Sequence, residues 1–170
     1  MSGALAISNG SSSEWSTPRW LFDACALRWG PFDLDVAATA ANAKCERFYT
    51  RADDGLVQPW DGRVWCNPPY GRGEIELWLR RAASLAHLAA PLTMLLPANT
   101  DTAWWHDYVM EWASEIALLR GRVRFETPEG GAAGAPKFGS AVVVFGGPVR
   151  PVRIYSWDVT RACGRNRRIT

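Results

Sequence analysis

"VWCNPPYG", residues 64–71, combines the features of a buried strand with those of an abrupt strand end. Its first three residues are all apolar, which is typical of a strand buried on both faces of a sheet. Two prolines follow almost at once, and a proline has no N–H to donate to a strand ladder. The strand must therefore stop at Asn67, and the polar side chains of Asn67 and Tyr70 fall at its carboxyl end.

Apolar runs of strand length alternate with amphipathic runs of helix length on both sides of this stretch. The alternation predicts an α/β fold with a mostly parallel sheet. The last two apolar runs, 116–121 and 140–146, are separated by a polar, glycine-rich segment without a helical pattern, so we expect the C-terminal strand to be antiparallel. Strands are expected at 32–38, 63–66, 92–97, 116–121 and 140–146, and helices within 16–30, 74–90 and 102–114.

Length and composition favour one domain. The chain has 170 residues, of which 48% are hydrophobic, and this suits a single core spanning 15–158. Residues 1–14 are small and polar and are expected to be a flexible N-terminus, while 159–170 read as a basic C-terminal tail. A net charge of +2 neither requires nor excludes a polyanionic partner, so any nucleic-acid function must rest on local features.

The four cysteines are widely spaced and form no C-x-x-C pair. Such spacing favours reduced thiols in a cytosolic protein over a disulfide framework, and we expect no metal site. No secretory leader is evident, and no apolar run reaches the length that crosses a bilayer. The expectation is a soluble, intracellular protein without a membrane partner, present as a monomer or a weak dimer.

The tetrapeptide Asn-Pro-Pro-Tyr has the chemistry to hold a planar amine at the edge of the sheet where α/β proteins bind ligands. The amide oxygen of Asn67 and the carbonyl of Pro68 can accept the two amine hydrogens, while Tyr70 can stack on the attached ring. Such acceptors restore the nitrogen lone pair and stabilise the positive charge that develops on it. The alternative is that this step is only a turn leaving a strand, because Asn and Pro favour turns.

The chain resembles the phage-type (Dam-like) DNA adenine-N6 methyltransferase family over about residues 15–146. The resemblance implies a compact Rossmann-like methyltransferase sheet and methyl transfer from S-adenosylmethionine to adenine in double-stranded DNA. It also implies action in the cytoplasm of a bacterial host, from a phage or prophage gene, with Asn67, Pro68, Pro69 and Tyr70 as the catalytic motif. The matching runs are FDLDVAATAANAKCERFYTRADDGLVQPWDGRVWCNPPYG (32–71), LLPANTDTAWWH (95–106), LLRGRVRF (118–125) and KFGSAVVVF (137–145).

The resemblance also implies a set of cofactor-binding residues. Thr17 and Pro18 match a step near the methionine end of the cofactor, and Asp35, with Asp33 as a second candidate, would lie near its amino group. Ala37, in the turn after that strand, and Asp54 complete the set. Asp residues are also ordinary turn formers, so a turn role is the alternative for all three acids. The sequence departs from the wider superfamily at 36–39, where a glycine-rich turn is expected and none is present.

DNA contacts are expected from residues at the same edge of the sheet. Asn99 and Thr100 follow the strand at 92–97, although helix capping is the alternative for them. Arg120, Arg122 and Arg124 alternate, so an extended backbone would put them on one face with Lys137 nearby. This row could pair with phosphates, or it could be no more than a solvated strand face.

Three rival functions stay open. The acceptor could be the N4 amine of cytosine or a protein glutamine amide, since each presents the same kind of planar nitrogen. The chain could instead be a non-enzymatic DNA-binding protein that has lost the cofactor, a reading supported only by the absent glycine-rich turn.

Overall fold

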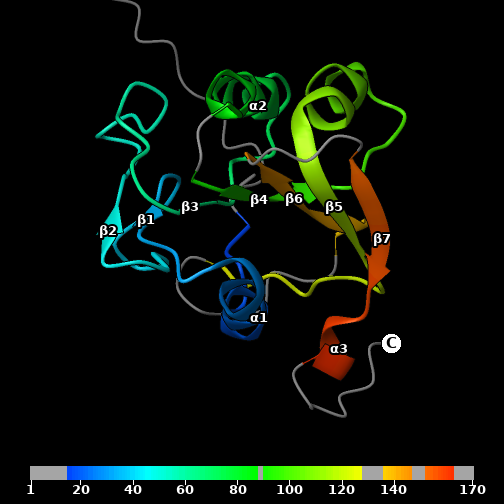
Figure 1. The fold of residues 1–170 in the computed structure, drawn as a ribbon. Coiled ribbons are helices and arrows are strands. Elements are labelled where there is room, and N and C mark those ends of the chain that lie inside the picture. The colour runs from blue at the N-terminus through cyan, green and yellow to red at the C-terminus, as the bar shows by residue number, and fades with distance from the viewer. Residues whose placement is uncertain (1–14, 88–89, 128–135, 147–151, 163–170) are drawn as a thin grey trace, which may run out of the picture.

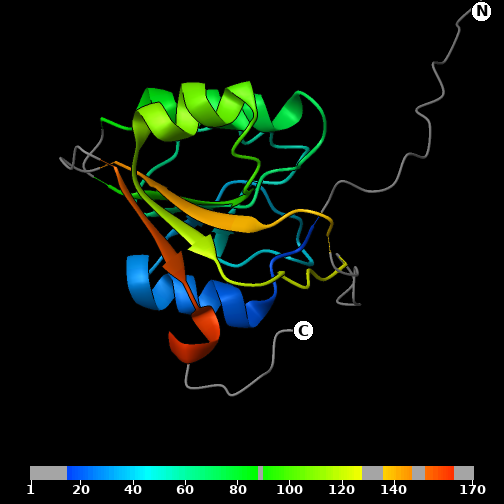
Figure 2. The same cartoon turned by 90° about the vertical axis from the view of Figure 1, so that its right-hand side faces the viewer.

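The computed structural model describes residues 15–87, 90–127, 136–146 and 152–162. Within these residues one seven-stranded sheet has helices on both faces: α2 and η1 cover one face, and α1 and α3 cover the other (Figures 1 and 2). The elements are α1 (Arg19–Trp29), β1 (Leu34–Asp35), β2 (Arg47–Phe48), β3 (Val64–Cys66), α2 (Glu74–Leu85), β4 (Leu92–Pro97), the π-helix η1 (Trp105–Met110), β5 (Ala113–Leu119), β6 (Ser140–Phe145), β7 (Arg153–Trp157) and α3 (Val159–Ala162).

The strand order is β2-β1-β3-β4-β6-β5-β7. Strands β2, β1, β3 and β4 pair in parallel, whereas β6 is antiparallel to both β4 and β5. The predicted α/β sheet, mostly parallel with an antiparallel strand near the C-terminus, is therefore observed. Two strands were not expected from the sequence: the two-residue β2, and β7, which follows the antiparallel strand and runs parallel to β5.

Alternation along the central strands builds two cores, one on each face of the sheet. Val64 and Cys66 pack on the α2 side, while Trp65 between them packs on the α1 side. The Trp65 ring meets Phe22 of α1 edge-on, with 5.4 Å between ring centroids. Burial on both faces explains why this strand is apolar at every position.

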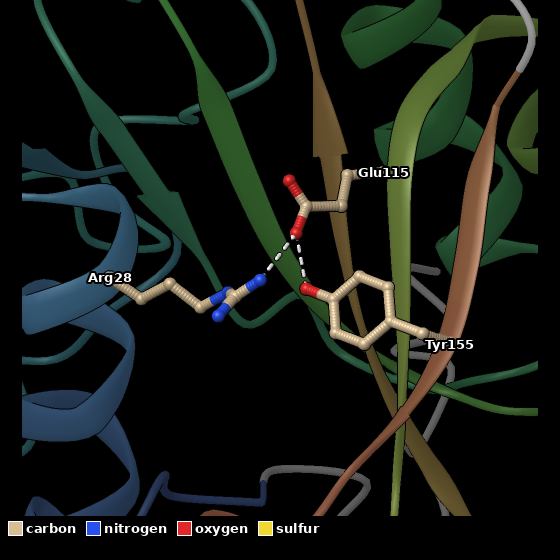
Figure 3. Close-up of polar contacts among 3 residues, drawn as sticks. All are labelled: Arg28, Glu115 and Tyr155. Carbon is tan, nitrogen blue, oxygen red and sulfur yellow. Dashed lines mark hydrogen bonds and ion pairs between the residues drawn. The ribbon is translucent and has the colours of Figure 1, made fainter. Parts of the chain in front are cut away.

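A polar cluster ties α1 to the far edge of the sheet (Figure 3). Arg28 Nη2 of α1 donates to Glu115 Oε1 of β5 at 3.1 Å, and the Tyr155 hydroxyl of β7 donates to the same oxygen. The Arg28 guanidinium also lies 5.1 Å from the centroids of the Trp29 and Tyr155 rings. These contacts join residues from three elements and add to the parallel pairing of β7 with β5.

Helix α1 begins after Pro18 and no side chain caps it, while Ser16 is paired with Glu126 through two backbone hydrogen bonds of 3.0 Å. Two other local details differ from the sequence-based expectation. The third expected helix is shorter, and β5 begins at Ala113. The helix α3 lies inside the segment assigned to the tail, and Val159 is buried.

The expected domain boundaries fall partly outside the residues that the structure describes. The flexible N-terminus 1–14 and the end of the tail, 163–170, lie outside the described residues. Among the described residues, none of the helices has the length and apolar character needed to span a bilayer.

Candidate active site

A cavity of about 270 Å³ opens at the carboxyl ends of β1 and β3. Its walls come from the segment before α1, the loop after β1, the turn between β2 and β3, the motif after β3 and the first turns of α2. Of the residues predicted from the sequence, the cavity is lined by Thr17, Asp35, Ala37, Asp54, Asn67, Pro68 and Pro69. The structure thus brings the Asn-Pro-Pro step together with acids and a hydroxyl from three other segments.

Two residues predicted to bind the cofactor lie outside the cavity lining. Asp33 precedes β1 at its amino end, where its carboxylate accepts the Arg63 N–H at 2.8 Å and its own N–H donates to Arg63 O at 2.8 Å. These contacts join Asp33 to a residue 30 positions away that leads into the neighbouring strand β3, so the Asp33 side chain connects two strands and does not form a local turn. Pro18 is buried, and its carbonyl accepts N–H groups from the first turn of α1.

Asn67 is held at both ends of its side-chain amide. Its Nδ2 donates to the backbone oxygen of Trp15, and its Oδ1 accepts the hydroxyl of Tyr70 at 2.7 Å. The Tyr70 hydroxyl also lies 2.9 Å from Leu95 O on the neighbouring strand β4. Burial raises the pKa of Tyr70 well above its ordinary value, so this hydroxyl stays protonated and donates.

The ring of Tyr70 belongs to an aromatic cluster and does not line the cavity. It meets Phe125 and Phe138 edge-on, at centroid distances of 6.2 and 5.7 Å. Trp15 packs against the same two rings at 5.4 and 6.0 Å. The cluster joins the segment before α1, the catalytic motif and the segments flanking β6.

Asp35 and Lys44 present opposite charges at the same side of the cavity. The Asp35 carboxylate is 3% exposed and accepts the backbone N–H groups of Ala37 at 3.3 Å and Lys44 at 3.1 Å. Burial outweighs these hydrogen bonds and raises the pKa of Asp35 to about 6. Burial also lowers the pKa of Lys44. Lys44 was not expected at the site from the sequence, although it is the only charged residue between Val36 and Cys45.

Thr17 adds a polar group without a protein partner. Its side chain is 2% exposed, and the described residues offer no hydrogen-bond partner to its Oγ1. A buried hydroxyl left in this state costs free energy unless a bound molecule satisfies it. Because Thr17 lines the cavity, this group points to a polar ligand there.

A glycine-rich turn with close backbone approach was expected after β1. The close approach is instead made by Gly55, in the turn between β2 and β3. A Cβ on Gly55 would stand 2.2 Å from Val36 O, so only a glycine lets this turn pack against the loop after β1. The Gly55 carbonyl accepts the indole N–H of Trp60 at 2.7 Å, and this hydrogen bond helps to hold the turn in place. Beside it, Asp54 has a positive φ of 53°, and its carboxylate accepts the Leu56 N–H.

The family model described as "DNA N-6-adenine-methyltransferase (Dam)" matches residues 7–166. The chain belongs to this Dam family. The "DNA N-6-adenine-methyltransferase" of Escherichia phage T1 is 39% identical over 107 residues, which are 62% of this chain and 44% of the phage protein. The chain therefore spans less than half the length of that relative. A protein of Escherichia coli strain K12 named "Putative methyltransferase YfdM" is 36% identical over 64 residues, 34% of this chain and 70% of that one.

The fold of this Dam-family chain is also found in a solved methyltransferase structure. A Listeria monocytogenes protein described as a "putative class i s-adenosylmethionine-dependent methyltransferase" matches 91% of this chain and 69% of its own, with a TM-score of 0.50 and 8% identity. At that identity the likeness concerns the fold alone. The resemblance and the fold class predicted from the sequence are confirmed.

Basic residues lie beside the aromatic cluster of the Dam-family site. Arg122 and Arg124 are exposed and alternate with buried Val123 and Phe125, as the predicted one-face arrangement requires. Phe125 contacts Tyr70, and exposed Lys137 directly precedes Phe138, which also contacts Tyr70. The row therefore lies next to the motif.

Arg122 also has a contact within the protein, because its Nη1 donates to Pro136 O at 3.3 Å. The other predicted DNA-binding residues lie in an ion pair and in a turn. Arg120 forms an ion pair with Asp158 at 3.8 Å. The Asn99 carbonyl accepts both the N–H and the hydroxyl of Thr102, at 3.1 and 2.7 Å, in a turn that also contains Thr100 and leads toward η1. In the described part of the chain, no group of three or more His, Cys, Asp and Glu side chains could hold a metal ion.

Proposed function

We propose that this Dam-family chain transfers a methyl group from S-adenosylmethionine to the exocyclic amine of adenine in double-stranded DNA. The observation that supports this most strongly is a single cavity lined both by the Asn67–Pro69 step and by the buried groups Thr17 and Asp35. One part of the cavity offers acceptors for an amine, and another offers charges that suit an amino-acid moiety. Family membership supports the same reaction.

The cavity residues fit the methionine moiety of the cofactor. When bound, S-adenosylmethionine supplies an electrophilic methyl group on a positively charged sulfur. The Asp35 carboxylate would hold the α-ammonium group, while the Lys44 ammonium would pair with the α-carboxylate. The buried Thr17 hydroxyl would gain the partner it lacks within the chain. Asp54 lines the cavity on the side of the 51–57 turn, where it can accept hydroxyl groups of the ribose.

The amine acceptors would be Asn67 Oδ1 and the carbonyl of Pro68. The nitrogen of an aromatic amine is a poor nucleophile because its lone pair is delocalised into the ring. Two acceptors placed on its hydrogens draw the nitrogen toward tetrahedral geometry and stabilise the positive charge that forms on attack. The proton can leave after the methyl group is transferred, so the reaction needs no strong base.

Adenine must leave the base stack to reach this cavity, at a cost of a few kcal/mol. The exposed row of Arg122, Arg124 and Lys137 would hold the phosphates of the opened duplex. We infer that the enzyme acts on DNA in the cytoplasm of a bacterial host, as a monomer or a weak dimer.

The decisive experiment measures transfer of labelled methyl from S-adenosylmethionine to unmethylated duplex DNA, with mass spectrometry of the digested nucleosides. The parent protein should make N6-methyladenine, and Asn67→Ala should slow the transfer by about 10² to 10³, the usual loss for one transition-state contact of this kind. Isothermal titration of S-adenosylmethionine into both proteins should give similar binding heats.

Other outcomes would redirect the proposal. Methylcytosine would change the acceptor and leave the amine chemistry intact, and labelled glutamine in added protein substrates would move the reaction away from DNA. If neither binding heat nor transfer is observed and the protein still binds duplex DNA, the chain is a DNA-binding protein without the cofactor.

A further inference from the structure

We infer that Trp60 is a positioning residue for S-adenosylmethionine binding. Its indole N–H holds the turn at 51–57, so that the Asp54 carboxylate keeps its place in the cavity wall. The inference rests on the proposed function and deepens it, because Trp60 itself lies outside the cavity lining. Trp60 therefore acts on the cofactor through other residues.

The backbone of the 51–57 turn is unusual at Asp54. Among the described residues, Asp54 is the one non-glycine residue with a positive φ, of 53°. Asp tolerates this left-handed conformation better than most residues, but the conformation persists only where the surroundings hold it. Within the turn, Asp54 O accepts the Val57 N–H at 3.0 Å, and the Asp54 carboxylate accepts the Leu56 N–H at 3.3 Å. These short-range contacts close the turn but do not fix it to the rest of the protein.

Trp60 provides a contact that fixes the turn. Its indole N–H donates to the carbonyl of Gly55, the residue next to Asp54, at 2.7 Å. Gly55 is buried, and the Trp60 side chain is 6% exposed. A buried carbonyl without its donor is costly, so loss of the N–H would favour a turn that moves toward water. Asp54 would move with it.

Helix α2 in turn holds the ring of Trp60. Trp60 stacks on Trp78 of α2, with 5.9 Å between ring centroids and 23° between ring planes. The Arg81 guanidinium, also on α2, lies 5.9 Å from the Trp60 centroid, and its Nη2 donates to Gln58 O at 3.2 Å. Trp78 belongs to the cavity lining. Trp60 thus connects two walls of the cavity, the one formed by α2 and the one formed by the turn.

This arrangement has a specific consequence for the cofactor. Only molecules with the turn in place present Asp54 to the ribose, and the apparent affinity falls in proportion to their fraction. Trp60 makes no contact in the cavity, so removing its N–H changes that fraction and leaves the methyl-transfer step alone. We therefore expect an effect on cofactor binding without an effect on the rate at saturation.

The test is Trp60→Phe, which keeps an aromatic ring and removes the N–H. Titration calorimetry should show about tenfold weaker binding of S-adenosylmethionine, because fewer molecules hold the turn in place. The KM for S-adenosylmethionine should rise, while kcat at saturating cofactor should stay within about twofold of the parent. In the protein without cofactor, hydrogen exchange of the Val57 N–H, which donates to Asp54 O, should become faster.

Trp157→Phe is the matched control, because it makes the same substitution at another buried site. Trp157 is 8% exposed on β7 and packs edge-on against Trp29 at 4.9 Å, outside the cavity lining. This variant should lower the stability of the protein, measured by urea unfolding, and keep the parent affinity for S-adenosylmethionine. It separates positioning of the turn from a general loss of stability.

A second background tests whether Trp60 acts through Asp54. Asp54→Asn keeps a residue that adopts a left-handed backbone and removes the carboxylate. Trp60→Phe should therefore cost less affinity in Asp54→Asn than in the parent.

Parent-like cofactor affinity in Trp60→Phe, an equal loss in Trp157→Phe, or the same fold loss in both backgrounds would overturn the inference. Absence of binding heat with the parent protein would instead refute the proposed cofactor. Unchanged Val57 exchange in Trp60→Phe would then still show that the indole does not hold the turn.

Discussion

At the scale of single residues, folding raises the pKa of Asp35, an effect that the residues around it in the sequence do not indicate. A carboxylate in a turn ordinarily titrates near pH 4. Here the side chain is 3% exposed, and burial raises its pKa to about 6 despite hydrogen bonds from two backbone N–H groups. Burial makes the charged carboxylate unfavourable, and a cationic partner would stabilise it, as expected for a ligand-binding acid.

This raised pKa predicts a pH-dependent stability. Between about pH 4 and pH 6 the unfolded chain loses the Asp35 proton while the folded protein retains it, so the free energy of unfolding should fall as the pH rises through this window. The full change should be about 3 kcal/mol, from roughly two pKa units. Urea unfolding of the parent and Asp35→Asn at several pH values measures it.

The test is how the difference in the free energy of unfolding between the parent and Asp35→Asn changes with pH. Asp35→Asn should lack this component of the pH dependence, so that its stability relative to the parent increases between pH 4 and pH 7. A constant difference across that range would show that Asp35 titrates normally in the folded protein.

At the scale of elements, the cavity depends on how closely the turn between β2 and β3 approaches the loop after β1. Gly55 permits that approach, because a Cβ there would lie 2.2 Å from Val36 O and 3.1 Å from the Trp78 ring. Both contacts are with groups that line the cavity. The shape of the site is therefore sensitive to one methyl group at a residue without a side chain.

Gly55→Ala should destabilise the protein by about 1–3 kcal/mol, the usual cost of forcing an atom into a packed site. It should also weaken S-adenosylmethionine binding, because the turn must move away from the loop. Gly139→Ala is the matched control, since its Cβ would meet only Ala98 at 3.9 Å and should change neither property. Thermal unfolding measures the change in stability, and titration calorimetry measures the change in S-adenosylmethionine binding. If both variants match in stability and binding, the close approach at Gly55 does not shape the cavity.

At the scale of the whole molecule, the small net charge of +2 conceals a local concentration of basic side chains beside the motif. Arg122 and Arg124 point outward from a segment whose alternate residues are buried against the aromatic cluster. If both contact phosphates, Arg122→Gln/Arg124→Gln should lower the slope of log affinity against log salt concentration by about 2. Fluorescence anisotropy with labelled duplex, at several salt concentrations, measures that slope.

Arg153→Gln is the control, because Arg153 is also exposed but begins β7 at the amino ends of the parallel strands. It should leave the slope unchanged. An equal decrease in the slope for the control would mean that DNA binding depends on the overall charge of the protein. No decrease for the double variant would mean that the row is only a solvated strand face.

Most of the fold could be predicted, and the exceptions have physical reasons. The central strands are apolar and continuous because both faces are buried, so β3, β4 and β6 stand out in the sequence. Strand β7 does not, because it lies at the edge and four of its five residues are partly or fully exposed. Its position depends instead on its parallel pairing with β5 and on the Tyr155–Glu115–Arg28 cluster, both of which join distant parts of the chain.

The end of β3 follows from the residues themselves, since proline has no N–H wherever it stands. The place of Asn67 at the ligand-binding edge of an α/β sheet follows from the same pattern. Folding, in contrast, brings Lys44 to the cavity and leaves Asp33 outside it, and it makes Gly55 the point of close backbone approach. Folding also brings the Tyr70 hydroxyl to Leu95, 25 residues away in the chain. Local preferences depend on covalent geometry within a few residues, whereas these contacts depend on which strands become neighbours.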